Sequence, residues 1–428
     1  MNLASIGPTN PGTVGPTNPG TTEPASPVFI QAPNPSTPAT PAMMALPAGP
    51  LSGDASTHRK FYTLTASLRE IYDDNINTTS GNKQSSLETQ LTPSVLVDFP
   101  MENSDFSARY SLGVTYYGNS SNNSGGNGGS TSTIEYTNEF TAQYNHAFSG
   151  RFNLGLADLF RNYTEPSLFE STGTNYRNGA YNSNTFNGSF GAQMTPLLGS
   201  STSYSNTIVK YDNAAVALDQ NSMENTGTES VSFAVLPKIS LSLGGTGDNI
   251  SYDSGVRGYT SYTGFIGIQW QALPSVSVSG QGGGSYTETV QNQTSIAPYA
   301  ALSLGWTLGA RSSLSFSYAH EVTPSDQIGA NGQTSDRLSA NLRYDITTSL
   351  SSHLQGIFTN ANISQQLATA GGSSGYSEYD YALDTGLTYH YNTFLDLDFG
   401  ITLSGVTSDI SALSYTRDET YVGVRGTY

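Results

Sequence analysis

Apolar and polar residues alternate along most of this chain, so that every second side chain falls on the same face. The clearest example is residues 394–404, where Leu395, Leu397, Phe399, Ile401 and Leu403 alternate with Asp396, Asp398, Gly400, Thr402 and Ser404. A period of two predicts a β-strand with one apolar and one polar face. A strand of about 11 residues, rising ~3.4 Å per residue and tilted by ~40°, spans roughly 28 Å, close to the apolar layer of a membrane.

The alternation continues from Lys60 to the end of the chain, although residues 202–212 and 245–252 alternate least cleanly. Short turns are expected near 100–105, 149–150, 196–201, 236–238, 272–275, 309–311, 347–349 and 391–393. Longer polar loops are expected near 73–86, 118–133, 163–182, 213–224, 253–258, 289–294, 323–335, 364–378 and 407–414. These 17 connections join 18 strands. An even strand number, with both ends on the short-turn side, is typical of an antiparallel up-and-down transmembrane β-barrel.

Sandwich strands are usually shorter than these, and an open sheet of this size would need a covering layer. A β-solenoid would need a fixed short repeat, which the chain lacks. Aromatic residues near the predicted strand ends fit the girdles of a membrane barrel. They are Tyr116, Tyr117, Phe148, Phe152, Trp270, Trp306, Tyr389 and Tyr391. All of this favours an all-β transmembrane barrel of about 18 strands.

Residues 1–57 have a different composition, with 12 of the 20 prolines in the first 50 residues. The sequence Gly-Pro-Thr-Asn-Pro-Gly-Thr occurs at 7–13 and again at 15–21. Such a segment cannot bury a core and favours extended conformers, so we expect a disordered periplasmic leader before a barrel of residues 58–428. The alternative is a spacer that reaches a periplasmic partner, over on the order of 150 Å if extended.

Composition narrows the function. Hydrophobic residues make up 36% and charged residues 11% of the chain, which suits strands with one lipid-facing and one wet face. No apolar run approaches the roughly 18 residues of a membrane helix. The net charge of −17 argues against a nucleic-acid partner, and the absence of cysteine rules out disulfides and thiolate metal sites. The start at Met1 has no secretory signal peptide, so we expect a mature form or a start downstream of the true one.

The last strand, Arg417–Tyr428, ends on an aromatic residue. Val422, Val424 and Tyr428 share its apolar face and form the expected membrane-assembly signal, read by the barrel-assembly machinery. In a closed barrel this strand would pair with the first one, leaving no open edge.

Several segments resemble the beta-barrel porin 2 family of outer-membrane proteins. They are Tyr72–Asn77, Leu91–Val95, Asn103–Ser107, Tyr110–Tyr117 and Arg417–Val422. The resemblance is strongest over residues 60–120 and at the chain end, and the Pro-rich leader is not part of it. It implies a large monomeric barrel of the bacterial outer membrane, in some members linked to exopolysaccharide or capsule export. It identifies no functional residue in this chain.

If the apolar faces meet lipid, the polar faces line the lumen. The expected lumen-lining charged residues are Arg69, Glu88, Asp98, Arg109, Glu135, Glu139, Arg151, Arg161, Arg337, Arg343, Asp345, Asp384, Asp396, Asp398 and Arg425. Symmetric pairing about the last loop predicts Arg425 opposite Asp396, with Asp398 diagonal. Such pairs could hold the wall together, or could create a transverse field that orients a polar solute.

The sequence gives little support for a catalytic site or a metal site. Asp73, Asp74 and Asn75 suggest a Ca²⁺ loop, but Gly81 and Glu88 do not fall at the spacing of such a loop, and turn capping explains these residues better. The five histidines lack metal spacing. His320-Glu321 near the outer rim invites comparison with barrel hydrolases, but the neighbouring strands offer no convincing Ser or Asp partner. We therefore expect no enzyme, no metal and no cofactor.

A barrel of 18 strands has a backbone diameter of roughly 36 Å, wide enough for an aqueous channel unless loops or the leader fill it. The primary hypothesis is an outer-membrane passage for secreted exopolysaccharide or other polar solutes, with a periplasmic polysaccharide-export protein as partner. A general diffusion porin is the alternative. A structural or adhesive protein with a plugged lumen is the third possibility. The expected surroundings are outer-membrane lipid, with a monomer favoured.

Overall fold

The computed structural model describes residues 61–118, 134–164, 168–169, 180–309, 311–325, 330–364 and 375–428. The predicted leader, residues 1–57, and most of the predicted loops 118–133, 163–182 and 364–378 lie outside the described residues. Within the described part of the chain, no helix is long and apolar enough to cross a membrane.

The fold is a single antiparallel sheet of 18 strands in sequence order, closed into a barrel. The first nine strands are β1 (Tyr62–Asp73), β2 (Ser86–Pro100), β3 (Ser104–Tyr117), β4 (Ile134–Ser149), β5 (Phe152–Tyr163), β6 (Tyr181–Gln193), β7 (Leu198–Tyr211), β8 (Ser222–Leu236) and β9 (Ile239–Tyr252). The others are β10 (Gly258–Leu273), β11 (Val276–Thr289), β12 (Thr294–Thr307), β13 (Ser313–Thr323), β14 (Gln333–Asp345), β15 (Leu350–Asn362), β16 (Ser377–His390), β17 (Leu395–Ser408) and β18 (Tyr415–Thr427). The predicted strand number and the alternation of short turns and long loops are confirmed.

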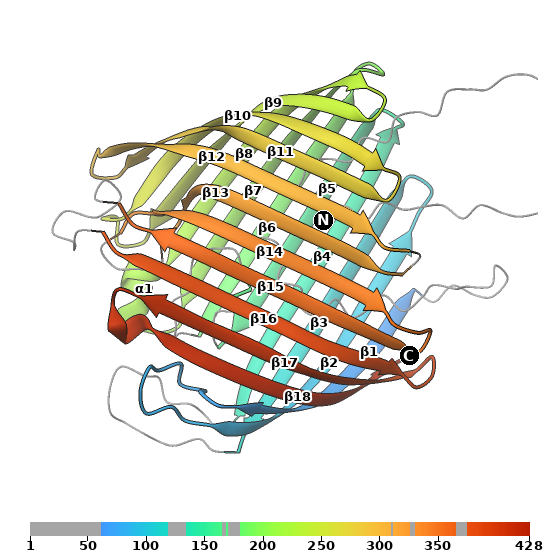
Figure 1. The fold of residues 1–428 in the computed structure, drawn as a ribbon, viewed down its shortest axis with the longest axis vertical. Helices are drawn as coiled ribbons and strands as arrows, with labels where there is room; N and C mark the ends of the chain where they lie inside the picture. Colours follow the sequence, from blue (N-terminus) through green and yellow to red (C-terminus); the bar gives the residue numbers. More distant parts are fainter. Residues whose placement is uncertain are drawn as a thin grey trace, which may run out of the picture.

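Two short helical segments lie in the long connections, α1 (Ala214–Gln220) between β7 and β8, and η1 (Ser411–Leu413) between β17 and β18. Figure 1 shows the strands of the near wall, β12 to β18, crossing in front of those of the far wall. In the same view α1 lies at the end of the barrel opposite the carboxyl terminus.

The first and last strands close the barrel. Leu64 and Tyr428 exchange two backbone hydrogen bonds, of 3.0 and 2.8 Å, and the pairing continues to Asp73 opposite Glu419. Every strand therefore has two neighbours and no ladder edge remains, which is the condition for placing a sheet in lipid.

The two faces of the wall differ as the alternation predicts. From Leu397 to Leu403 on β17, the apolar side chains are exposed and the residues between them are buried or half-buried. Side chains on the outside of an isolated barrel are exposed, whereas those on the concave inside crowd one another, so the apolar face is the outer one. Trp270, Trp306 and Tyr389 are exposed near the short turns, and Tyr116 near the long loops. Tyr117 differs from the predicted girdle, because it faces inward and its hydroxyl donates to Glu135 at 3.1 Å.

The outer face is more polar over β5 to β9. The pairing register places Asp158 opposite Phe186, and Glu229 opposite Thr202, among outward side chains. Asn184 donates to Asp158 at 3.2 Å, and the Thr202 hydroxyl donates to Glu229. This explains why residues 202–212 and 245–252 alternate poorly: the outward positions include Thr202, Asn206 and Lys210 on β7, and Gly245, Gly247 and Asn249 on β9.

Candidate functional site

The candidate site is the polar inner face of the barrel. The register places the following charged residues at positions that alternate with the outward apolar ones: Arg69, Asp98, Arg109, Glu139, Arg337, Arg343, Asp345, Asp384, Asp396, Asp398 and Arg425. Val422, Val424 and Tyr428, the expected assembly signal, fall on the outward face of β18. The following contacts show which of these residues the fold brings together.

Asp396 joins β16, β17 and β18 near the short turn. It lies opposite Arg425, whose Nη2 is 2.7 Å from Asp396 Oδ2, as the hairpin symmetry predicts. The Asp396 Oδ1 atom is 2.7 Å from His390 Nδ1, and His390 Nε2 lies 3.3 Å from the Ser351 hydroxyl. One carboxylate therefore binds an arginine and an imidazole from its two neighbouring strands.

A second group of contacting residues comes from β1, β15, β16, β17 and β18, and lies further from the short turns than Asp396. Arg69 Nη2 is 2.8 Å from Asp398, although β18 lies between their strands. The Arg69 guanidinium also lies 4.7 Å from the centre of the Tyr421 ring. The Tyr421 hydroxyl reaches His353 Nε2 at 3.3 Å, and the same nitrogen is 2.8 Å from Asp384. These residues form one connected strip of charge and hydrogen bonds along the wall.

The Tyr421 ring occupies the space that a side chain at Gly400 on the neighbouring strand would fill. It pairs with Gly400 across the β17–β18 ladder, and a Cβ added at Gly400 would collide with the Tyr421 phenol. A Cβ at Gly386 would approach the Tyr421 hydroxyl to 3.0 Å and the His353 ring to 2.6 Å. The ring therefore lies flat against the wall over Gly400, where the Arg69 guanidinium packs on it.

The far wall carries its own ion pair. Arg161 Nε donates to Glu139 Oε2 at 3.1 Å, and the Tyr163 hydroxyl donates to the same oxygen at 2.9 Å. Both charged side chains are more than nine-tenths buried. Since a buried charge is costly unless it is paired, this contact fixes β4 against β5 and leaves no net charge there.

One residue of the connection after β5 contacts the opposite wall. The Phe169 carbonyl accepts a hydrogen bond of 3.3 Å from Arg337 Nη2 on β14, which lies on the opposite side of the strand order. Arg337 Nη1 is also 3.5 Å from the Thr359 hydroxyl on β15. The Phe169 backbone therefore lies beside Arg337 on the inner face of that wall.

Arg257 joins three of the long loops. Its guanidinium donates to the carbonyls of Ala330, Asp219 and Ser325 at 2.8, 2.8 and 2.7 Å, and it lies 4.1 Å from the Tyr252 ring centre. Arg257 is only 2% exposed. Arg257 therefore links the connection after β9 to α1 and to the two described ends of the connection between β13 and β14.

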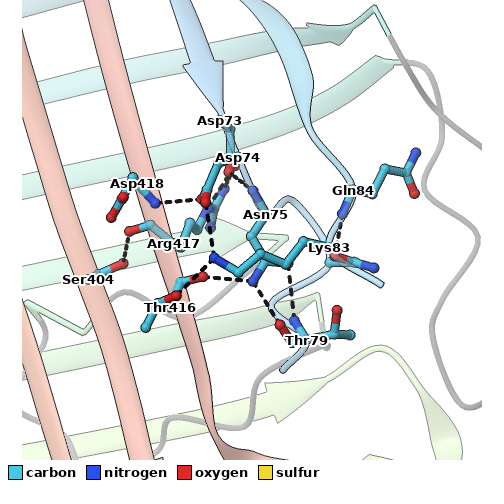
Figure 2. Close-up of polar contacts among 11 residues, drawn as sticks. Asp73, Asp74, Asn75, Thr79, Lys83, Gln84, Ser404, Thr416, Arg417 and Asp418 are labelled. Atoms are coloured by element: carbon cyan, nitrogen blue, oxygen red, sulfur yellow. Dashed lines mark hydrogen bonds and ion pairs between the residues drawn. The ribbon is translucent and has the colours of Figure 1, made fainter. Parts of the chain in front are cut away.

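The seam between β1 and β18 is fixed at the same end (Figure 2). Arg417 contacts the Asp73 carboxylate at 2.6 Å, and the Asn75 backbone N–H donates to it at 2.7 Å. Lys83 lies 3.0 Å from Asp74, which also accepts the Asp418 backbone N–H at 2.7 Å. Partial burial raises the pKa of Asp74, but the Asp418 N–H and the Lys83 ammonium together hold this pKa below its usual value.

These contacts favour turn capping over Ca²⁺ binding for the loop after β1. In the described part of the chain, no group of three or more His, Cys, Asp or Glu side chains could hold a metal ion.

His320 pairs with Asp336 at 2.8 Å, and the Tyr318 hydroxyl donates to the same carboxylate at 2.8 Å. All three lie on the face of β13 and β14 that also carries exposed Phe316 and Leu338, so they point outward. His320 therefore does have the aspartate partner that the strand pattern failed to suggest. The register places Ala300 and Asn360 beside this pair, neither of which is a nucleophile of the hydrolase kind.

Comparison with known proteins shows that the chain resembles solved structures in fold only. No family model and no curated protein sequence matches the chain. Solved structures that it resembles include OccK9 (OpdG) of Pseudomonas aeruginosa (11% identity, 86% of this chain and 100% of that one, TM-score 0.46). Another is OccAB4 of Acinetobacter baumannii (9% identity, 86% of this chain and 98% of that one, TM-score 0.43). A third is a BenF-like porin from Pseudomonas fluorescens Pf-5 (11% identity, 86% of this chain and 99% of that one, TM-score 0.44). The resemblance to the beta-barrel porin 2 family stays a prediction.

Proposed function

We propose that this chain is an outer-membrane channel for small polar solutes. The observation that carries the proposal is the division of each wall strand into an exposed apolar outer face and a charged inner face, seen most clearly on β17. A closed ladder with an apolar outside is stable in lipid, and charged groups inside it require water. The outer-membrane location and the periplasmic position of residues 1–57 are parts of the same proposal.

The geometry favours small solutes over a wide polymer passage. Phe169 contacts Arg337 on the opposite wall, and Arg257 binds the carbonyls of Asp219, Ser325 and Ala330 at the long-loop end. The lumen wall alternates fixed charges with hydroxyl and imidazole groups, which can replace the hydration of a polar solute. Export of exopolysaccharide with a periplasmic partner remains a prediction from the family resemblance, as does assembly through the terminal signal.

Solute entry into liposomes tests the proposal. Liposomes containing the refolded chain, suspended in an iso-osmotic monosaccharide, should swell faster than empty liposomes. A trisaccharide should enter more slowly, because the contact between Phe169 and Arg337 crosses the passage. Swelling no faster than that of empty liposomes, with every sugar, would rule out a small-solute channel. Entry of long polysaccharide as fast as of monosaccharide would favour the export hypothesis instead.

A further inference from the structure

A polar patch interrupts the apolar outer face of β5 to β8. It consists of six outward side chains: Asp158, Asn184, Thr202, Asn206, Asn225 and Glu229. On β5, Asp158 lies between the outward residues Leu156 and Phe160. On β8, the patch residues lie between the outward residues Met223 and Val231. The polar patch therefore lies within the apolar band of the wall and not at its rim.

The hydrogen bonds inside the polar patch leave its two carboxylates facing outward. Asn184 Nδ2 lies 3.2 Å from both carboxylate oxygens of Asp158, and the Thr202 hydroxyl donates to Glu229. Neither contact supplies a positive charge. Carboxylates that face the acyl chains of a lipid are costly. A barrel that is stable in lipid should therefore have protein over this patch.

The centre of the polar patch is complementary to itself. Asn225 Oδ1 accepts hydrogen bonds from the Tyr204 hydroxyl at 2.8 Å and from Asn206 Nδ2 at 2.9 Å. Within the described residues, Asn225 Nδ2 and Asn206 Oδ1 have no hydrogen-bond partner. A two-fold axis between β7 and β8 places the free donor of each copy on the side of the free acceptor of the other. The patch therefore fits a second copy of itself.

Glycines beside the polar patch allow two barrels to approach closely. Gly227 pairs with Gly247, and Gly245 pairs with Gly264, all at outward positions. A Cβ at Gly227 or Gly264 would meet no atom within 4 Å, so the surface there is open. Small residues allow the same close approach where helices pack in membranes.

We propose that two copies of this chain associate side by side in the membrane through the polar patch. Two barrels inserted in the same direction present the patch at the same depth, so its amides and carboxylates are covered by protein instead of lipid. A dimer differs from the monomer expected from the family resemblance. This inference rests on the membrane location within the proposed function, and not on conduction.

Energy transfer between labelled copies tests the dimer. The chain contains no cysteine, so thiols can be introduced one at a time. Ser200 and Ser352 are half-buried, outward residues near the short-turn ends of β7 and β15, which lie on nearly opposite sides of the strand order. Full-length S200C, labelled with donor or acceptor dyes and diluted in lipid vesicles, should show energy transfer. Full-length S352C should show only the transfer of random encounters, because both barrels separate its labels.

Two results of this comparison would overturn the dimer. Equal transfer from the two positions would mean that the barrels meet only at random. Transfer from neither position, with both thiols labelled, would mean that another molecule covers the polar patch.

A second comparison tests the polar patch itself. N206L/N225L in the S200C background should weaken dimerisation about tenfold, the loss expected for the hydrogen bonds between the copies. N360L is the matched control, because it replaces an outward amide on β15 and should leave the transfer unchanged. Leucine suits a lipid-facing position, so both variants should fold, which heat-modifiable migration on gels checks. Unchanged transfer in N206L/N225L would place the contact elsewhere on the barrel and overturn the inference.

Sugar entry into the same vesicles separates the dimer from the channel. Energy transfer from S200C in barrels that admit no sugar would contradict the channel and leave the dimer standing. Sugar entry through barrels that show no transfer would leave the channel standing and overturn the dimer.

Discussion

Arg337 on β14 donates a hydrogen bond to the carbonyl of Phe169, which belongs to the loop that follows β5 on the opposite wall. This contact crosses the barrel. Arg337 also lies 3.5 Å from the Thr359 hydroxyl, and the carboxylates of Glu321 and Asp380 act on its charge. If the chain is a channel as proposed, its conductance should depend on this side chain more than on other arginines of the inner face.

The first prediction concerns that loop. Arg337→Met should release the Phe169 carbonyl and raise single-channel conductance, with larger fluctuations as the loop moves. Arg343→Met is the matched control. It removes an inward positive charge from the same strand, six residues closer to the short turn than Arg337. Equal effects of the two substitutions would mean that charge, and not the loop contact, sets the conductance.

The second prediction tests which face meets lipid. Ile401 and Thr402 are neighbours at the middle of β17, with side chains on opposite faces. Ile401→Arg should destabilise the barrel by about 2–4 kcal/mol, as arginine does at the middle of a membrane. Thr402→Arg places the charge in the lumen and should cost far less. Urea titrations in lipid vesicles measure both, and similar costs at the two positions would contradict the assignment of faces.

The third prediction concerns the seam between β1 and β18. Asp73 is fully buried and depends on Arg417. Arg417→Met should cost about 3–5 kcal/mol, because it leaves a buried carboxylate without its cation. The double variant D73N/R417M should recover part of that loss. If the double variant were less stable than R417M in the same urea titration, the ion pair would not explain the effect.

The fourth prediction is a pH dependence at the same seam. The pKa of Asp74 lies below its usual value in the folded protein, so its contribution to stability is present above the unfolded-state pKa of ~3.9. That contribution is lost as pH falls through the lower, folded-state value. Hydrogen exchange at the Asp418 amide, which donates to Asp74, should accelerate below about pH 4 relative to a neighbouring ladder amide. Asp74→Asn should remove this difference, and its persistence in that variant would point to another group.

The fifth prediction concerns the glycine beneath Tyr421. Gly400→Ala should destabilise the barrel by about 1–3 kcal/mol, the cost of overpacking, because the added methyl group meets the phenol ring. The G400A/Y421L double variant should recover that loss. A Gly400→Ala variant as stable as the wild type would show that the ring does not need this position.

Much of the fold can be predicted from the sequence. In an up-and-down barrel each strand pairs with the strands next to it in sequence, so the positions of strands and turns determine the topology. The period of two predicts the strands, and the lengths of polar segments predict which connections are turns. The turn expected at 196–201 ends later than in the structure, where β7 already begins at Leu198. That segment, Leu198–Tyr204, has serine, threonine and glycine at positions where an apolar signal was expected.

The inner face was only partly predictable. Asp396 opposite Arg425 follows from hairpin symmetry, since both lie on one short-range ladder. Arg69 with Asp398 could not be derived, because a whole strand separates them and the contact depends on side-chain reach. The Phe169–Arg337 contact and the burial of Arg257 depend on how loops fold over the mouth, for which alternation gives no signal.

Single-channel recording in a planar bilayer tests the central claim most directly. The refolded full chain and a form lacking residues 1–57 should both show steady conductance steps, because the barrel alone forms the passage. Conductance that appears only after removal of residues 1–57 would contradict an open channel and favour a leader-gated export pathway. Silence in both forms, with the barrel correctly folded, would contradict the account and leave a plugged barrel with a structural role.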